Sequence, residues 1–134
     1  DGTVEALRKL KDAGYLLIVV TNQAGIAKGL YSREDVWRCH EFFQQQCGHL
    51  LDDLYFCPHH PEHTTNSLLR KPDSLMLEKA MAKHRIDRHR SWMIGDRERD
   101  VLAGRKAGVR TIRIAHPPLE VAPLGEHTTR SLLE

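Results

Sequence analysis

Hydroxyl, amide, cationic and carboxylate side chains follow three separate apolar runs of this sequence. They are Thr21, Asn22 and Gln23 after YLLIVV, Arg70 and Lys71 in the loop beyond LYFC, and Asp96 and Asp100 after SWMIG. A hydroxyl with backbone N–H groups can hold phosphoryl oxygens, Lys and Arg neutralise their charge, and a carboxylate binds Mg²⁺ beside them. This inventory favours phosphoryl transfer over other chemistries.

The elements that must position these side chains alternate between helix and strand. Apolar spacing predicts helices over residues 4–13, 36–51, 74–84 and 100–107, the first of them capped by Asp1 or Thr3. The runs YLLIVV, LYFC, SWMIG and VRTIRI predict strands, and YLLIVV lacks the alternation of a half-exposed strand, so we expect it to be buried on both faces. The order predicts an α/β fold, a parallel sheet covered by helices, in a single domain over residues 1–134.

Each of these residues also has a purely structural interpretation. Thr21 fits an ordinary turn hydroxyl, and Lys71 fits a solvated cation. Gly95 and Asp96 fit the start of a helix, and Asp100 fits a charge that complements the helix dipole. Ligands of parallel sheets bind beyond the carboxyl ends of the strands, so finding all of these residues at successive strand ends favours one shared site. In that site the glycine before Asp96 is expected to let the backbone and a metal approach closely.

Composition and charge exclude several classes of function. The net charge of +2 comes from 20 basic and 18 acidic residues without a block of either sign, so neither nucleic acid nor an anionic membrane is an expected partner. The run YLLIVV is too short to span a bilayer. The 3 cysteines are odd in number and are not spaced as a disulfide framework, which favours the reducing cytoplasm. We expect a cytoplasmic monomer that binds a small phosphorylated metabolite.

Taken together, the motifs resemble those of the haloacid dehalogenase (HAD) superfamily of phosphatases. Its second, third and fourth motifs match Thr21 after YLLIVV, Lys71 in RKP, and GDRERD at 95–100. The heptose 1,7-bisphosphate phosphatases and the related histidinol-phosphate phosphatases are similar at TNQAGIAKG (21–29), CPHHP (57–61) and RKP (70–72). CPHHP favours the heptose branch, and the similarity covers nearly the whole chain.

The resemblance implies a HAD-like fold with a Rossmannoid parallel sheet. It also implies an enzyme that hydrolyses a phosphate ester in two steps. A nucleophilic aspartate attacks the phosphoryl group, a second aspartate protonates the leaving oxygen and then activates water, and Mg²⁺ bridges carboxylate and phosphate. By motif, Thr21 is expected to hydrogen-bond the phosphoryl group and Lys71 to steady the aspartyl phosphate. Asp96 is expected to bind Mg²⁺, with Asp100 supporting that site. The residues expected to contact substrate are Asn22, Gln23, Lys28 and Arg70.

The first motif of the family, a strand ending in Asp-x-Asp-Gly-Thr, has no counterpart in this sequence. Asp1, Gly2 and Thr3 imitate its tail, but their segment matches the later family helix that leads into YLLIVV. Both catalytic aspartates are then absent, together with the strand that in the family lies between the strands ending at Thr21 and Gly95. We expect the natural protein to begin upstream with an Asp-x-Asp motif, and the chain as given to have negligible activity.

A second departure from the family concerns zinc. The heptose branch often carries a structural zinc loop, in which Cys57 and His59 would be joined by two cysteines just before RKP. This sequence has Ser67 and Leu69 at those two positions. Neither is a usual zinc ligand, so no structural zinc is expected. Lys28 stands where the family has arginine, and residues 116–134 predict an irregular crossing chain with a final helix cut short.

Two classes of function follow from the sequence. The first is a Mg²⁺-dependent phosphatase acting on a heptose bisphosphate or on histidinol phosphate. The second is a non-catalytic relative that keeps the phosphate-binding residues and acts as a binding or interaction protein. A phosphatase assay of the full-length product with heptose bisphosphate and Mg²⁺ separates the two.

Overall fold

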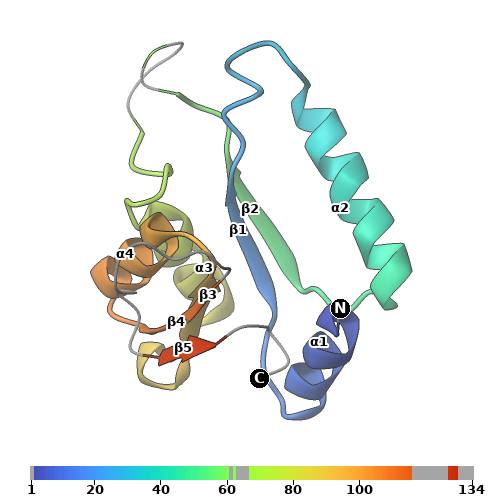
Figure 1. The fold of residues 1–134 in the computed structure, drawn as a ribbon, viewed down its shortest axis with the longest axis vertical. Helices are drawn as coiled ribbons and strands as arrows, with labels where there is room; N and C mark the ends of the chain where they lie inside the picture. The colour runs from blue at the N-terminus through green and yellow to red at the C-terminus, as the bar shows by residue number, and fades with distance from the viewer. Residues whose placement is uncertain (1, 61, 63–66, 116–126, 130–134) are drawn as a thin grey trace.

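Helices and parallel strands alternate along the chain, as the sequence predicted. The computed structural model describes residues 2–60, 62, 67–115 and 127–129 (Figure 1). The elements are α1 (Thr3–Asp12), β1 (Ile18–Asn22), α2 (Arg33–Cys47), β2 (Asp53–Cys57), α3 (Leu75–His84), a short 3-10 helix (Arg88–Arg90), β3 (Trp92–Gly95), α4 (Glu98–Ala107), β4 (Arg110–Ile114) and β5 (His127–Thr129). All strand pairs are parallel, which confirms the α/β class. No helix in these ranges is long and apolar enough to cross a membrane.

The prediction of a strand over YLLIVV that is buried on both faces was only partly right. β1 begins at Ile18, its residues are only partly buried, and Tyr15 and Leu16 lie outside it and are exposed, but the strand does have packing on both faces. Val19 packs into a cluster with Leu7 of α1 and Cys47 at the end of α2. Val20, which points the other way, packs against a cluster built from α3, β3 and α4 that includes Met81 and Met93. Figure 1 accordingly shows α1 and α2 on one side of β1 and β2, and α3 on the other. Alternate residues of one short strand therefore hold two separate helical layers together.

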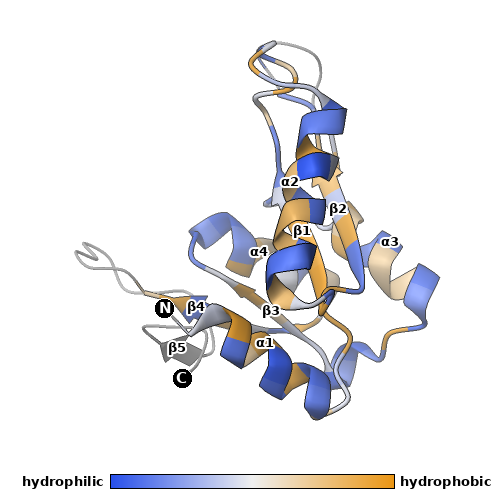
Figure 2. Ribbon diagram, turned by 90° about the vertical axis from the view of Figure 1, so that its right-hand side faces the viewer, coloured by the Kyte–Doolittle hydropathy of each residue, from blue (hydrophilic) through white to orange (hydrophobic). Residues whose placement is uncertain are grey.

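The described strands form two sheets, β1-β2 and β3-β4-β5, rather than one. A groove of about 600 Å³ lies between them, and its walls include Leu17 and Val20 from one side and Met93 and Ile112 from the other. The strands that border it, β1 and β3, are largely apolar in Figure 2. No described strand pairs with both β1 and β3, which agrees with the expectation drawn from the missing first motif.

The second helix, α2, begins at Arg33, three residues before the predicted start at 36, and ends at Cys47 rather than at residue 51. Ser32 caps it: its Oγ accepts a hydrogen bond from Asp35 N at 3.2 Å, and the Asp35 carboxylate accepts one from Ser32 N at 2.9 Å. Gly48 then takes a left-handed conformation with φ 76°, which closes the helix. Leu50 and Leu51, which the helical spacing had assigned to α2, are instead buried in the connection to β2.

Two further predictions about local structure were wrong. The cap of α1 is Gly2, with φ 80°, and not Thr3; Asp1 lies outside the described residues. Residues 127–129 form β5 on the edge of β4, although the sequence predicted irregular chain there. The segment EHTTR has no apolar run to mark a strand, and its pairing depends on the free edge that β4 offers. The expected helix after Leu132 lies outside the described residues.

Asp53, at the start of β2, ties that strand to the end of α3. Its Oδ2 accepts a hydrogen bond from Lys83 Nζ at 3.0 Å and lies 2.8 Å from His84 Nε2. Burial raises the pKa of the Asp53 carboxyl, but the hydrogen bonds from His84 and Lys83 outweigh burial and hold that pKa well below its usual range. A carboxyl with a pKa lowered by folding stabilises the fold above its unfolded pKa of about 4, and this contribution is lost as the pH falls further.

We therefore expect Asp53→Asn to make the stability less sensitive to acid. Between about pH 5 and pH 3 the native sequence should lose about 1 kcal/mol more unfolding free energy than the variant, because only the native sequence has this carboxylate to protonate. Urea titrations across that range measure the difference. Asp12→Asn, at an exposed position, is the matched control and should keep the native pH slope. Equal slopes for the native sequence and Asp53→Asn would contradict the prediction.

Candidate active site

The carboxyl end of β1 places three predicted site residues beside the end of β2. Thr21 pairs with Phe56 and Asn22 with Cys57 in parallel register. Gln23 N continues the pairing by donating to the Cys57 carbonyl at 2.8 Å. The two chains therefore leave the sheet at the same edge, where ligands of parallel sheets bind.

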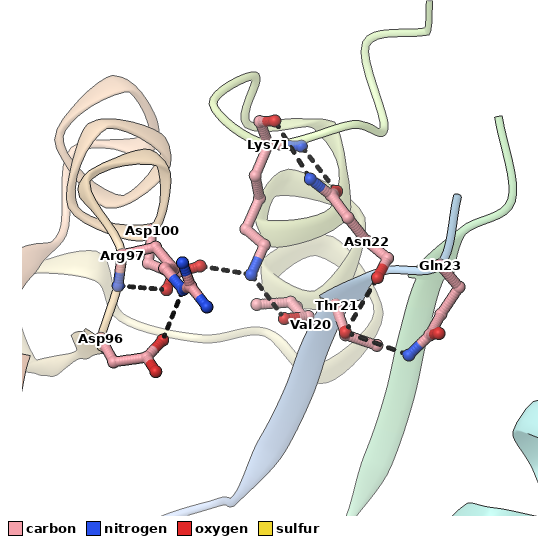
Figure 3. Close-up of polar contacts among 8 residues, drawn as sticks. All are labelled: Val20, Thr21, Asn22, Gln23, Lys71, Asp96, Arg97 and Asp100. Atoms are coloured by element: carbon pink, nitrogen blue, oxygen red, sulfur yellow. Dashed lines mark hydrogen bonds and ion pairs between the residues drawn. The ribbon is translucent and has the colours of Figure 1, made fainter. Parts of the chain in front are cut away.

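The side chain of Asn22 joins this edge to Lys71, 49 residues further along the chain. Its Nδ2 donates to the Lys71 carbonyl at 3.2 Å, and its Oδ1 accepts from Lys71 N at 2.9 Å (Figure 3). The sequence predicted Asn22 as a substrate contact. The structure uses both ends of its amide to hold the backbone of Lys71.

The ammonium of Lys71 lies between β1 and the start of α4. It donates to the Val20 carbonyl at 3.1 Å and forms a hydrogen-bonded ion pair with Asp100 Oδ1 (Figure 3). Because Gln23 N points toward β2, the alternation of a strand directs the Val20 carbonyl to the opposite edge of β1, which pairs with no described strand. Lys71 is 8% exposed and Asp100 is 5% exposed. A buried ion pair therefore links the open edge of β1 to the first turn of α4.

The two carboxylates after β3 have different surroundings. Asp100 uses both oxygens: Oδ1 pairs with Lys71, and Oδ2 accepts from Arg97 N at 3.1 Å, which caps the start of α4. The Asp96 side chain is 49% exposed, and its Oδ1 lies 3.9 Å from Arg97 Nε. Asp96 is therefore the carboxylate accessible to a metal ion, and Asp100 is suited to supporting the site. Metal binding by Asp96 stays a prediction.

Gly95 makes room for Asp100. A Cβ at position 95 would lie 2.3 Å from Asp100 Oδ2 and 2.4 Å from Asp100 Cβ, far inside van der Waals contact. From the sequence, this glycine was expected to let a metal approach the backbone. In the structure the atoms that approach it are those of the Asp100 side chain, so the glycine positions the ion pair.

Side chains around Thr21 form a second polar group on the loop after β1. Thr21 Oγ1 accepts from Gln23 Nε2 at 3.3 Å and donates to the Asn22 carbonyl at 3.3 Å. Tyr31, which the sequence analysis did not select, donates from its hydroxyl to Gln23 Oε1 at 2.5 Å. Its ring covers Gly25, where a Cβ would meet ring atoms at 2.1 Å. Tyr31 follows no strand and matches no motif, so only the folded loop reveals it.

The remaining predicted contacts lie further from Lys71. Arg70 Nη1 donates to the His59 carbonyl at 3.4 Å, which directs it toward the loop after β2. Lys28 is exposed in the loop after β1, and among the described residues no side-chain hydrogen bond joins it to Lys71. Their contacts with substrate stay predictions.

The end of β2 and the loop after it contain the four positions at which the family can bind zinc: Cys57, His59, Ser67 and Leu69. Cys57 is fully buried, with Sγ 4.0 Å from the His59 carbonyl oxygen, and Ser67 Oγ accepts from Leu69 N at 3.1 Å. Within the described ranges, no three His, Cys, Asp or Glu side chains are grouped closely enough to hold a metal ion. The lack of a structural zinc stays a prediction that rests on the ligand types at positions 67 and 69.

Comparison with known proteins identifies the family to which this chain is similar. Residues 68–116 match the model of the HAD-hydrolase-like family. The D-glycero-beta-D-manno-heptose-1,7-bisphosphate 7-phosphatase of Pasteurella multocida is 36% identical over 141 aligned residues, which cover 100% of this chain and 77% of that protein. The enzyme of the same name from Haemophilus ducreyi is 39% identical over 119 residues, and this chain spans 65% of its length.

Solved structures agree on the fold. The crystal structure of D,D-heptose 1,7-bisphosphate phosphatase from B. bronchiseptica, complexed with magnesium and phosphate, matches with a TM-score of 0.85 at 22% identity, covering 98% of this chain and 78% of that one. A HAD-like phosphatase from Mesorhizobium loti matches with a TM-score of 0.75 at 28% identity. With its sequence relatives and its parallel strands covered by helices, the chain belongs to the haloacid dehalogenase superfamily of hydrolases, in the branch of the heptose bisphosphate phosphatases.

Proposed function

We propose that this chain provides the phosphate-binding and magnesium-binding part of a phosphatase that hydrolyses a heptose bisphosphate. The observation that carries the proposal is the buried ion pair of Lys71 and Asp100. The Lys71 ammonium also donates to the carbonyl of Val20, the residue before Thr21, so the pair lies between β1 of one sheet and the helix that follows β3 of the other. The names of relatives at 36% and 39% identity support the heptose substrate. Magnesium and phosphate in the B. bronchiseptica structure support the chemistry.

Lys71 has one donor left for substrate. An ammonium carries three N–H groups, and the described residues accept two of them, at Val20 and Asp100. The third can donate to a phosphoryl oxygen while the other two hold the nitrogen in place. Because the site is buried, a charge fixed in this way stabilises the developing negative charge more strongly than a solvated lysine would. Thr21, the residue after Val20, adds a hydroxyl donor. Its hydrogen bond to the Asn22 carbonyl is long, at 3.3 Å, so the hydroxyl can give up this bond and donate to a phosphoryl oxygen instead.

The exposed carboxylate of Asp96 fits a magnesium ion. Mg²⁺ usually takes one or two protein carboxylates and completes its shell with water and substrate phosphates, so one accessible carboxylate at this edge meets the requirement. When bound, the ion would neutralise charge on the phosphoryl oxygens. Asp100 keeps the first turn of α4 and Lys71 in position beside it.

In this proposal a segment outside the 134 residues supplies the nucleophilic aspartate and the acid/base aspartate. Neither of the carboxylates after β3 suits those roles, since Asp100 is committed to Lys71 and Arg97 N, and Asp96 is assigned to the metal. The nucleophilic aspartate would attack the phosphoryl group while the P–O bond to the sugar breaks and the second aspartate protonates the leaving oxygen. A water activated by that second aspartate would then hydrolyse the aspartyl phosphate and release phosphate.

The test uses the complete product of the gene that encodes this segment, assayed with heptose 1,7-bisphosphate and with histidinol phosphate in the presence of Mg²⁺. We expect turnover of the heptose ester that EDTA abolishes. Thr21→Val should lower kcat about 10²-fold because one hydrogen bond to the developing charge is removed, whereas Thr21→Ser keeps the hydroxyl and should retain most of the activity. A stable protein that binds phosphate but hydrolyses neither ester would overturn the proposal and favour a non-catalytic relative.

A further inference from the structure

We infer that Asn22 is a positioning residue for Lys71: its side-chain amide holds the Lys71 backbone against the end of β1 so that the ammonium meets Asp100. The inference rests on the proposed function for its catalytic consequence, and on the hydrogen bonds alone for its structural one. It replaces the expectation that Asn22 serves chiefly as a substrate contact.

The hydrogen bonds form a two-point clamp. Asn22 Nδ2 reaches the Lys71 carbonyl at 3.2 Å, and Asn22 Oδ1 receives Lys71 N–H at 2.9 Å. Two bonds between one amide and one residue fix the direction of the Lys71 backbone as well as its distance from β1. Figure 3 shows the lysine side chain running from this clamp back to the Val20 carbonyl, two residues earlier on the same strand.

The clamp provides the backbone N–H and C=O of Lys71 with the hydrogen-bond partners that a helix or a strand would otherwise provide. Lys71 lies outside any helix or strand, in the connection between Cys57 and Leu75, and it is buried. A buried backbone N–H or C=O without a partner is costly, and here the side chain of Asn22 provides both partners. The nearest backbone bonds of the loop, Arg70 N to Ser67 and Asp73 N to Arg70, shape the turn but do not attach it to β1.

A long side chain needs such an anchor to place its charge. A lysine has about 2 kcal/mol of rotamer entropy to lose, so its ammonium is held at one point only when both ends of the side chain are fixed. Asn22 fixes the backbone end, and Val20 and Asp100 fix the ammonium end. A shift of about 1 Å in a catalytic group can cost as much as 10²-fold in rate, so loosening the clamp should reach the chemistry without touching substrate.

The requirement for asparagine is specific. Only a carboxamide presents a donor and an acceptor side by side, as the carbonyl and N–H of Lys71 demand. Aspartate at position 22 would keep the bond from Lys71 N but would turn a carboxylate oxygen toward the Lys71 carbonyl. Asn22→Asp therefore breaks half of the clamp with no change in size.

The same loop offers a matched control. Asp73 forms an ion pair with Lys106 of α4, and this pair is largely exposed, with side chains 34% and 58% accessible. Asp73→Asn removes a tie between the loop and the body of the molecule but leaves the backbone of Lys71 clamped. A general loosening of the loop would affect both variants, whereas a loss of the clamp affects Asn22→Asp alone.

The experiment measures steady-state kinetics with heptose 1,7-bisphosphate and Mg²⁺, and hydrogen–deuterium exchange without substrate, on the complete gene product. For Asn22→Asp we expect kcat to fall about 10- to 100-fold with little change in KM, and amide exchange in residues 67–75 to quicken. Asp73→Asn should leave both close to native. A raised KM with unchanged kcat and unchanged exchange would overturn the inference and restore Asn22 as a substrate contact.

The exchange measurement separates this inference from the proposed function. If the native protein hydrolyses no phosphate ester, the proposed function fails, and faster exchange in Asn22→Asp alone would still support the clamp. If the native protein is active but Asn22→Asp exchanges like the native protein, the clamp fails and the proposed function stands.

Discussion

Lys71→Met is expected to lower the free energy of unfolding by about 3–5 kcal/mol, because it leaves the charge of Asp100 buried without its partner. Asp100 is 5% exposed, and its Oδ1 accepts its hydrogen bond from the Lys71 ammonium. Methionine keeps nearly the length and apolar bulk of lysine, so the loss reports the missing charge and not a cavity. Urea unfolding at neutral pH measures it directly.

A double variant provides the control for this prediction. Asp100→Asn removes the buried charge and keeps an oxygen that can accept from Arg97 N, so Lys71→Met with Asp100→Asn should be more stable than Lys71→Met alone. In the complete gene product the double variant should still lose about 10²-fold or more in kcat, since the ammonium that donates to the phosphoryl group is removed. A Lys71→Met variant as stable as the native protein would show that the pair is not buried as described.

Gly95→Ala is expected to cost about 3 kcal/mol of unfolding free energy, the upper end of what overpacking usually costs. The new methyl group would meet the Cβ of Asp100 at 2.4 Å as well as its carboxylate, so rotating the Asp100 side chain cannot relieve the clash. The first turn of α4 has to move, and the ion pair with Lys71 moves with it. Denaturant titration of the variant measures the loss.

Gly14→Ala is the matched control for this substitution. Nothing lies within 4 Å of a Cβ at position 14, and the only penalty is its left-handed backbone, with φ 93°. That penalty is about 1–2 kcal/mol, so Gly95→Ala should be clearly the more destabilising of the two. Equal losses in the two variants would mean that position 95 has space that the structure does not show.

Local patterns in the sequence carried most of the architecture. The unbroken run before Thr21 predicted a strand packed on both faces, and although β1 covers only the end of that run and is partly buried, Val19 and Val20 do pack against separate helical layers. Residues that follow successive parallel strands must meet at one edge of the sheet, so the sequence could also predict that Lys71 and Asp100 lie together. Each of these predictions needs only the periodicity of apolar residues or the order of helices and strands along the chain, and both can be found in short stretches of sequence.

The tertiary structure decided what each of those residues does. The residue types and the order of the strands indicated that Thr21, Lys71 and the carboxylates after β3 share one site. However, Lys71, the partner of Asn22, lies 49 positions away in the chain, and Asp100, the neighbour of Gly95, lies 5 positions away in α4. Strand β5 likewise has no apolar run that would predict it, and the structure shows it only through its pairing with β4. Hydrogen bonds and close packing between distant segments depend on ångström-scale geometry, which residue types and their spacing do not encode locally.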